Sequence, residues 1–90
     1  MPVTINIPPY LRQYTADNAT VTVKGKNVKS CLRALIEQYP QLNDLLFDVD
    51  NRIHNYISLF IGGDNVYSDT LEKPVKDGDT MHLIYIIGGG

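Results

Sequence analysis

The sequence of 90 residues, 43% hydrophobic and 20% charged, has the composition of a small globular domain rather than of a disordered chain. Eight basic residues stand against ten acidic ones, and this net charge of −2 excludes an electrostatic footprint for nucleic acid or for an anionic membrane surface. The single cysteine, Cys31, excludes an intrachain disulfide and a cysteine metal site, so we expect the protein in the reducing cytoplasm. From the length we expect one domain over residues 1–90.

Two alternating segments near the start of the chain predict a pair of strands. VTINI, residues 3–7, alternates apolar and polar side chains with period two. Pro8 and Pro9 end this strand, because proline cannot donate to a strand ladder. ATVTVKG repeats the alternation with Val21 and Val23 on one face. We expect the two strands to pair as a hairpin, with YLRQYTADN as a long connecting loop.

The following segment predicts the main helix. Asn27 is a favourable N-cap, and Pro40 stops the helical pattern. Between them apolar residues recur at spacings of three and four, which is typical of an amphipathic helix. The predicted buried face consists of Val28, Cys31, Leu32, Leu35, Ile36 and Tyr39.

QLNDLLFD predicts a short helical turn after this helix, and DVDNRIHN predicts a polar loop. The predicted buried side of the turn consists of Leu42, Leu45, Leu46 and Phe47.

Three more strands are expected in the rest of the chain. YISLFI alternates with Ile57, Leu59 and Ile61 facing the core. GGDN is a strong turn signal that returns the chain to Val66 and Tyr67, and DGD is a second turn before the last strand, TMHLIYII. The order strand, strand, helix, strand, short strand, strand predicts an α+β roll, a mixed sheet with one main helix packed across one face.

The last strand loses its alternation, since LIYII is apolar at five consecutive positions. Strands that are covered on both faces have this pattern, but one helix covers only one face of a sheet. We therefore predict a partner-docking surface on the other face. By strand parity its residues are Phe60, His82, Ile84 and Ile86. A homodimer interface, or cover by the chain's own loops, is the alternative for these residues.

The remaining reactive side chains form no catalytic or metal-binding pattern. Cys31 lies on the apolar face of the predicted helix, where a free cysteine is usually packed. His54 and His82 have no cysteine or carboxylate at ligand spacing and no nucleophile partner, so we expect no metal and no catalytic groups. Asp48 and Asp50 lie in a stretch that lacks the glycine and the distal glutamate of a calcium loop.

Four segments resemble the small sulfur-carrier proteins of the MoaD/ThiS family, the ubiquitin-like proteins of molybdopterin synthase and thiamine biosynthesis. These are IPPYLRQYT, NVKSCLRALIEQYP, NYISLFIGGDNV and LEKPVKDGDTMHLIYIIGGG, and the variety they resemble most is the carrier for cysteine synthesis. The family runs D-G-D and then eleven residues that end in V-A-G-G. Thr80 to Gly90 is also eleven residues, with Gly88 in place of the alanine and Tyr85 in place of a common proline.

The resemblance implies a β-grasp fold and a function for the last residue. The carboxylate of Gly90 would be adenylated by an ATP-dependent, E1-like activating enzyme and converted to a thiocarboxylate, which gives its sulfur to a downstream synthase. Gly88 and Gly89 would form a thin, flexible tail with Gly90, because glycine permits close backbone approach inside a narrow channel. The chain would be a protein-borne cosubstrate that binds no cofactor itself. Cysteine synthesis is the favoured pathway, with molybdopterin, thiamine or other thiolated products as alternatives.

Two other functions fit the same pattern. A ubiquitin-like modifier would use the activated carboxyl of Gly90 to join lysines of target proteins. A non-covalent β-grasp interaction module would leave the glycine tail inert. For each function we expect a monomer when the chain is free. The N-terminal MPVTINIPPY has neither a basic segment nor a long apolar run, so we expect no signal peptide.

Overall fold

The computed structural model describes residues 2–86, so the predicted glycine tail of residues 88–90 lies outside the described range. Five strands, two α-helices and two 3-10 helices follow one another along that range. They are β1 (Val3–Asn6), η1 (Pro9–Tyr14), β2 (Thr20–Val23), α1 (Val28–Gln38), α2 (Leu42–Leu46), β3 (Ile57–Ile61), β4 (Asp64–Val66), η2 (Ser68–Thr70) and β5 (Thr80–Tyr85).

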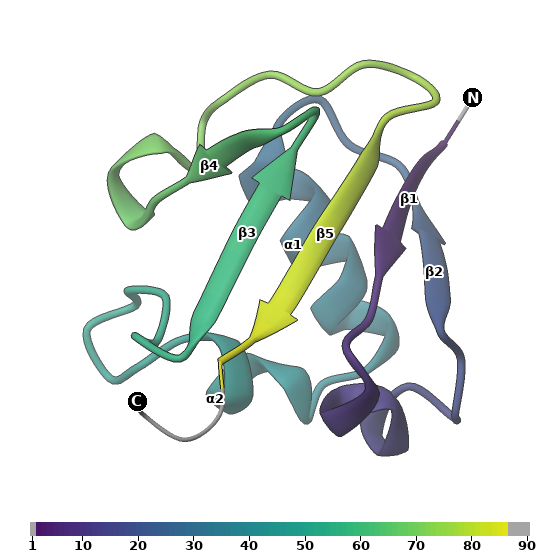
Figure 1. Ribbon diagram of the computed structural model, residues 1–90, viewed down its shortest axis with the longest axis vertical. Helices are drawn as coiled ribbons and strands as arrows, with labels where there is room; N and C mark the ends of the chain where they lie inside the picture. The colour runs from purple at the N-terminus through teal and green to yellow at the C-terminus, as the bar shows by residue number, and fades with distance from the viewer. Residues whose placement is uncertain (1, 87–90) are drawn as a thin grey trace.

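The strands form one mixed sheet in the order β2-β1-β5-β3-β4 (Figure 1). β5 is the central strand, parallel to β1 and antiparallel to β3. Antiparallel pairing of β1 with β2 and of β3 with β4 confirms the predicted hairpin and the predicted turn at GGDN. These directions bring the end of β1, the start of β3 and the end of β5 together, and we call this the exit end of the sheet.

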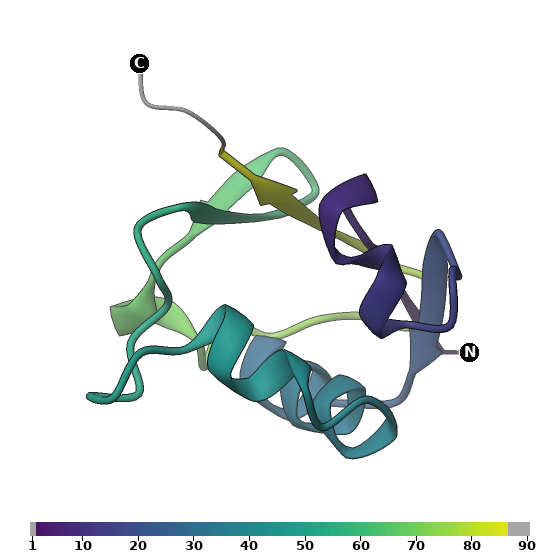
Figure 2. The ribbon, with the colours of Figure 1, turned by 90° about the horizontal axis from the view of Figure 1, so that it is seen from below.

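The helix α1 packs across one face of this sheet, as the view from below shows (Figure 2). Its start is fixed by a capping box. Asn27 Oδ1 accepts a hydrogen bond from the Ser30 amide at 2.8 Å, and Ser30 Oγ accepts one from the Asn27 amide at 3.1 Å. The predicted N-cap is thus confirmed, and so is the predicted α+β roll. Of the predicted helix face, Val28, Cys31, Leu32 and Leu35 are buried, whereas Ile36 and Tyr39 are half-buried.

The core lies between α1 and the strand residues that alternate toward it. Leu42 and Leu46 of α2 close one side of this core, and Leu45 and Phe47, also predicted to be buried, are only half-buried. The strand residues of the core are Val3, Ile5, Val21, Val23, Ile57, Leu59, Ile61, Val66, Met81 and Leu83. Within residues 2–86, both α-helices lie on the same side of the sheet (Figure 2).

Gly25 brings the connection between β2 and α1 against the first turn of the helix. A Cβ at this position would lie 2.7 Å from Cys31 Sγ and 2.9 Å from the Cys31 backbone nitrogen. Both distances are well inside van der Waals contact, so the packing at this point requires a residue without a side chain.

The segment after β1, predicted to be a loop, contains the six-residue 3-10 helix η1. Pro9 begins it, in a position where a missing amide hydrogen costs nothing. Leu11 is fully buried, and Thr15, also fully buried, donates from Oγ1 to the carbonyl of Asn18 at 3.0 Å. The loop prediction was therefore wrong, because a single 3-10 segment leaves no period of 3.6 residues in the sequence.

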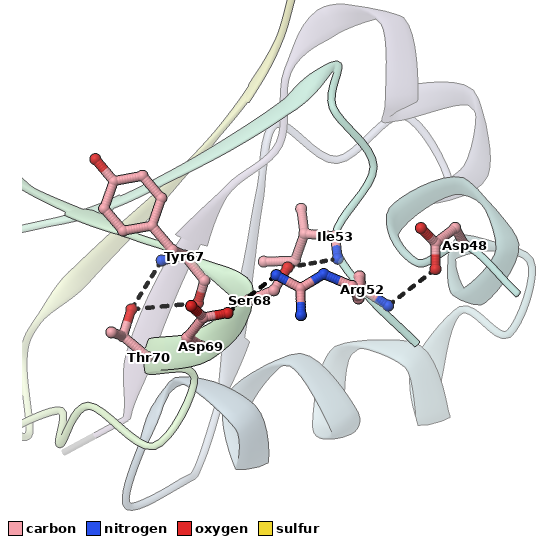
Figure 3. A network of polar contacts seen from close by, with 7 residues as sticks. All are labelled: Asp48, Arg52, Ile53, Tyr67, Ser68, Asp69 and Thr70. Atoms are coloured by element: carbon pink, nitrogen blue, oxygen red, sulfur yellow. Dashed lines mark hydrogen bonds and ion pairs between the residues drawn. The ribbon is translucent and has the colours of Figure 1, made fainter. Parts of the chain in front are cut away.

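The polar loop after α2 is confirmed, and it is held by a network that joins it to η2 (Figure 3). Asp48 Oδ1 accepts hydrogen bonds from the amides of Asp50 and Arg52 at 2.8 and 3.0 Å. Arg52 Nη2 donates to Asp69 Oδ1 at 3.0 Å, and the Ile53 amide donates to Ser68 Oγ at 2.9 Å.

The backbone amide of Arg52 is also the main cause that lowers the pKa of the Asp48 carboxyl below its usual value. The carboxylate of Asp48 therefore serves as an acceptor inside its own loop. At the other end of the network, β4 ends at Val66, so Tyr67 lies outside the strand in which it was predicted.

Candidate functional site

The predicted site lies at the exit end of the sheet, where β5 leads out of the fold (Figure 1). Gly88, Gly89 and Gly90 are outside the described residues, so the site is described as far as Ile86. The amide of Ile86 donates a hydrogen bond to the carbonyl of Tyr56 at 2.7 Å. This bond extends the β3–β5 ladder by one residue beyond the last residue of β5.

Three of the four predicted docking residues are brought together by the register of the sheet. Phe60 of β3 lies directly opposite His82 of β5, and Ile84 lies opposite Ser58. Residues that are opposite one another in a ladder share a face, and here it is the face away from α1. Ile86 follows Ile84 with the same parity, just after the strand. We call these four residues, Phe60, His82, Ile84 and Ile86, the docking face.

The docking face is accessible. Ile84 is 45% exposed and Ile86 is 52% exposed, which is a large fraction for isoleucine. His82 is exposed and Phe60 is half-buried. Among the described residues, no loop of the chain itself covers the two isoleucines, so cover by the chain's own loops is not their explanation. Their role in docking stays a prediction.

His82 is oriented by the neighbouring strand. Asn6 of β1 lies opposite His82, and its Nδ2 is 2.9 Å from His82 Nδ1. This contact with β1 fixes the orientation of the imidazole ring. The docking face therefore presents three apolar side chains, those of Phe60, Ile84 and Ile86, beside the imidazole of His82.

A row of four rings crosses the exit end of the sheet. Tyr85, the last residue of β5, stacks on Tyr10 of η1, with ring centroids 4.5 Å apart and an interplanar angle of 21°. Tyr85 also contacts Tyr56 at 5.1 Å with a tilt of 45°, and Tyr56 stacks on His54 at 4.6 Å. We call His54, Tyr56, Tyr85 and Tyr10 the aromatic row.

Tyr85 is half-buried. Desolvation is the largest cause that raises the pKa of its phenol above the usual value, and the neighbouring Tyr10 and Tyr56 raise it further. The phenol of Tyr85 is therefore neutral at physiological pH.

Sequence reasoning treated Tyr85 only as a substitution for a proline and did not single out Tyr10 or Tyr56. A signal was present, because the three tyrosines flank the end of β1, the start of β3 and the end of β5. Those positions meet only once the strand order is known.

Cys31 is packed in the core rather than exposed for reaction. Its side chain is fully buried, and burial raises the pKa of its thiol, which opposes formation of a reactive thiolate. Among residues 2–86, no group of three or more histidine, cysteine, aspartate or glutamate side chains is placed to hold a metal ion. None of the helices in that same range is long and apolar enough to cross a membrane.

Comparison with known proteins gives a consistent result. The model of the ThiS family matches residues 5–90. The chain is 25% identical over 93 residues to the sulfur carrier protein CysO of Mycobacterium tuberculosis, with 100% of each chain covered. A solved structure, the BexX/CysO complex of Amycolatopsis orientalis, contains a chain that matches with a TM-score of 0.85 and 26% identity, covering 98% of this chain and 99% of that one.

SAMP1 from Haloferax volcanii has the same TM-score of 0.85 at 22% identity, with 100% of each chain covered, and this likeness concerns the fold alone. The structural matches confirm the predicted ubiquitin-like β-grasp fold. Because the family model covers nearly the whole sequence, the chain belongs to the ThiS family of small protein carriers of sulfur.

Proposed function

We propose that this chain carries sulfur as a thiocarboxylate on Gly90. The observation that carries the proposal is the match of residues 5–90, the glycine tail included, to the ThiS family, together with relatives named sulfur carrier protein. The exposed docking face supports it, because it lies beside the point at which β5 leads to the tail.

The chemistry has three steps. The Gly90 carboxylate attacks the α-phosphorus of ATP on an activating enzyme, and pyrophosphate leaves to give an acyl-adenylate. A sulfide donor then attacks the acyl carbon, and AMP leaves with the electron pair of the broken C–O bond. The thiocarboxylate sulfur then bonds to an electrophilic carbon of an acceptor on a downstream synthase and displaces that carbon's leaving group. Water cleaves the acyl C–S bond, which leaves the sulfur on the acceptor and returns the carboxylate. This chain supplies the reacting terminus and the surface that docks it, while the partner enzymes supply the catalytic groups.

The docking face is the proposed contact for these enzymes. Ile84 and Ile86 provide apolar area that is still available for burial, and the exposed imidazole of His82 provides a polar group beside them. Interfaces of this kind are apolar at the centre and polar at the rim. Within the sulfur-carrier function, cysteine synthesis is the favoured pathway because the relatives carry the name CysO.

The intact mass of the chain from its native cells tests this proposal. We expect a species heavier by the difference between sulfur and oxygen, lost on alkaline hydrolysis and mapped to Gly90. The matched control is the same chain with one alanine appended after Gly90, which keeps the fold and displaces the reacting carboxylate. A chain that stays unmodified after incubation with ATP, sulfide and native extract would contradict the proposal.

A second function is kept because one similar fold belongs to a protein named small archaeal modifier protein 1. In this function an amine of a target lysine, rather than sulfide, attacks the adenylate of Gly90. High-mass adducts that resist reductant in cell lysate would favour it. Activity that survives deletion of residues 88–90 would instead indicate a non-covalent interaction module.

A further inference from the structure

Tyr85, next to the last described residue, contacts rings from two other segments of the fold. Its ring lies between Tyr10, which belongs to η1, and Tyr56, which leads into β3. The row continues to His54, whose Nε2 is 2.9 Å from the carbonyl of Asp44 in α2. The aromatic row is therefore anchored at one end by η1 and at the other by α2.

Both ends of the aromatic row are fixed to the rest of the fold. Next to Tyr10, Leu11 is completely buried, so η1 is fixed to the core rather than resting on the surface. At the other end, the amide of His54 donates to the carbonyl of Leu46 at 3.0 Å, and the amide of Ile57 donates to the carbonyl of His54 at 3.0 Å. Tyr85 is thus held between one segment that is fixed to the core by Leu11 and another that is hydrogen-bonded to α2.

The position of Ile86 limits how far from the sheet the carboxylate of Gly90 can lie. The bond from the Ile86 amide to the Tyr56 carbonyl keeps the backbone in register with β3 through residue 86. Four residues, 87–90, separate Ile86 from the proposed reacting carboxylate of Gly90, and four residues span at most about 13 to 14 Å when fully extended. If the chain detached from β3 at Tyr85 and Ile86, two more residues would have to be ordered whenever the terminus enters a partner's site.

We propose that Tyr85 is a positioning residue for the proposed sulfur-carrier reaction, because the aromatic row holds Tyr85 and Ile86 on the sheet and so fixes where the terminus leaves the fold. The inference rests on the proposed function and assigns a role to Tyr10, Tyr56 and Tyr85 that is separate from that of the docking face. The docking face determines how tightly the chain binds an activating enzyme. The aromatic row determines how often the terminus of the bound chain is aligned for reaction.

These two roles predict different effects on KM and kcat. A variant with a weaker docking face should raise KM and leave kcat nearly unchanged. A variant without the ring of Tyr85 should lower kcat and leave KM nearly unchanged, because the bound chain then spends less time with its terminus in line. Each aromatic pair favours the closed arrangement by a factor of about 2 to 13, so the two pairs of Tyr85 together contribute about 5- to 150-fold.

The first readout needs no partner enzyme. Deuterium exchange of the Ile86 amide, followed by NMR on the full chain, reports how often its bond to Tyr56 opens. Tyr85→Ala should accelerate this exchange by about 5- to 150-fold, and Tyr10→Ala, which removes one pair, by about 2- to 13-fold. Tyr85→Phe keeps both ring contacts and should exchange like wild type. Tyr67→Ala is the matched control, since Tyr67 is 60% exposed and lies outside the aromatic row.

The second readout is the rate of charging with ATP and sulfide in native extract, followed by intact mass at several concentrations of the chain. We expect kcat to fall in Tyr85→Ala, because a smaller share of the bound chains has its terminus aligned, and to return in Tyr85→Phe. Tyr10 is 50% exposed, so we expect Tyr10→Ala to fold even if Tyr85→Ala fails to fold. In that case the kcat and the exchange rate of Tyr10→Ala are compared with those of wild type.

The outcomes separate the two proposals. If wild type is charged and Tyr85→Ala and Tyr10→Ala are charged with wild-type kcat, the positioning role is overturned while the carrier function stands. Unchanged exchange at Ile86 in both variants overturns it as well. If wild type is never charged, the carrier function fails and the positioning role fails with it.

Discussion

Replacement of Ile84 should weaken docking without weakening the fold. The side chain of Ile84 points away from the core and is 45% exposed. Full burial of an isoleucine side chain stabilises by about 1.5 to 3 kcal/mol, so the exposed share offers a partner about 0.7 to 1.4 kcal/mol. Ile84→Ala should therefore raise the KM for charging by about 3- to 10-fold. Ile84→Asp should raise it by more than about 10-fold, because a carboxylate must also be desolvated at the contact.

The assay is the initial rate of thiocarboxylate formation against the concentration of the chain, with ATP and sulfide saturating. Thr22→Asp is the matched control. Thr22 pairs with Thr4 on the same face of the sheet but lies on the edge strand β2, away from the exit end. Thermal unfolding should move little in both variants, since substitutions at exposed strand positions change stability by at most about 1 kcal/mol. A wild-type KM for a folded Ile84→Asp variant would refute the docking face.

Three further predictions concern stability. Gly25→Ala should lower the free energy of unfolding by about 1 to 3 kcal/mol, because the new Cβ would lie 2.7 Å from Cys31 Sγ and also too close to a backbone atom that cannot move aside. Urea unfolding measures this change, and a midpoint equal to that of wild type would contradict the prediction. Asn27→Ala should cost about 0.5 to 2 kcal/mol through loss of the capping box, and Asn27→Asp, which keeps the acceptor oxygen, should recover most of it in the same experiment. Asp48 has a lowered pKa in the fold, so its contribution is present above the unfolded value of about 3.9 and is lost as pH falls through the folded value. Asp48→Asn should therefore flatten the acid side of a stability curve recorded by circular dichroism, and an acid side as steep as that of wild type would count against the loop network.

Much of this fold could be predicted because its main elements carry strong periods. The alternation in VTINI and in YISLFI locates β1 and β3, and Asn27 with the apolar spacing after it locates α1. The docking face followed from the same reasoning, since parity along β5 and β3 needs only the strands themselves. The register then placed Phe60 and His82 opposite one another.

The features that escaped prediction depend on contacts between distant segments. The short helix η1 follows two prolines and shows no period, and Leu11 looks like an ordinary loop residue until the core closes over it. Tyr10 and Tyr85 are 75 positions apart in the numbering, and only the parallel pairing of β1 with β5 brings their rings to 4.5 Å. Reasoning along one strand cannot find such a pair, whereas reasoning from the strand order can.

The central place of β5 has a consequence for synthesis of the chain. The hairpins β1–β2 and β3–β4 are joined in the sheet only through β5, which is the last of the described elements to leave the ribosome. The side-chain bond between Asn6 and His82 spans 76 positions, so the sheet closes late and through its least local contacts. A chain interrupted before Thr80 leaves two hairpins with no strand between them. Because His82 and Ile84 belong to β5, the proposed docking face forms only when this last strand has joined the sheet.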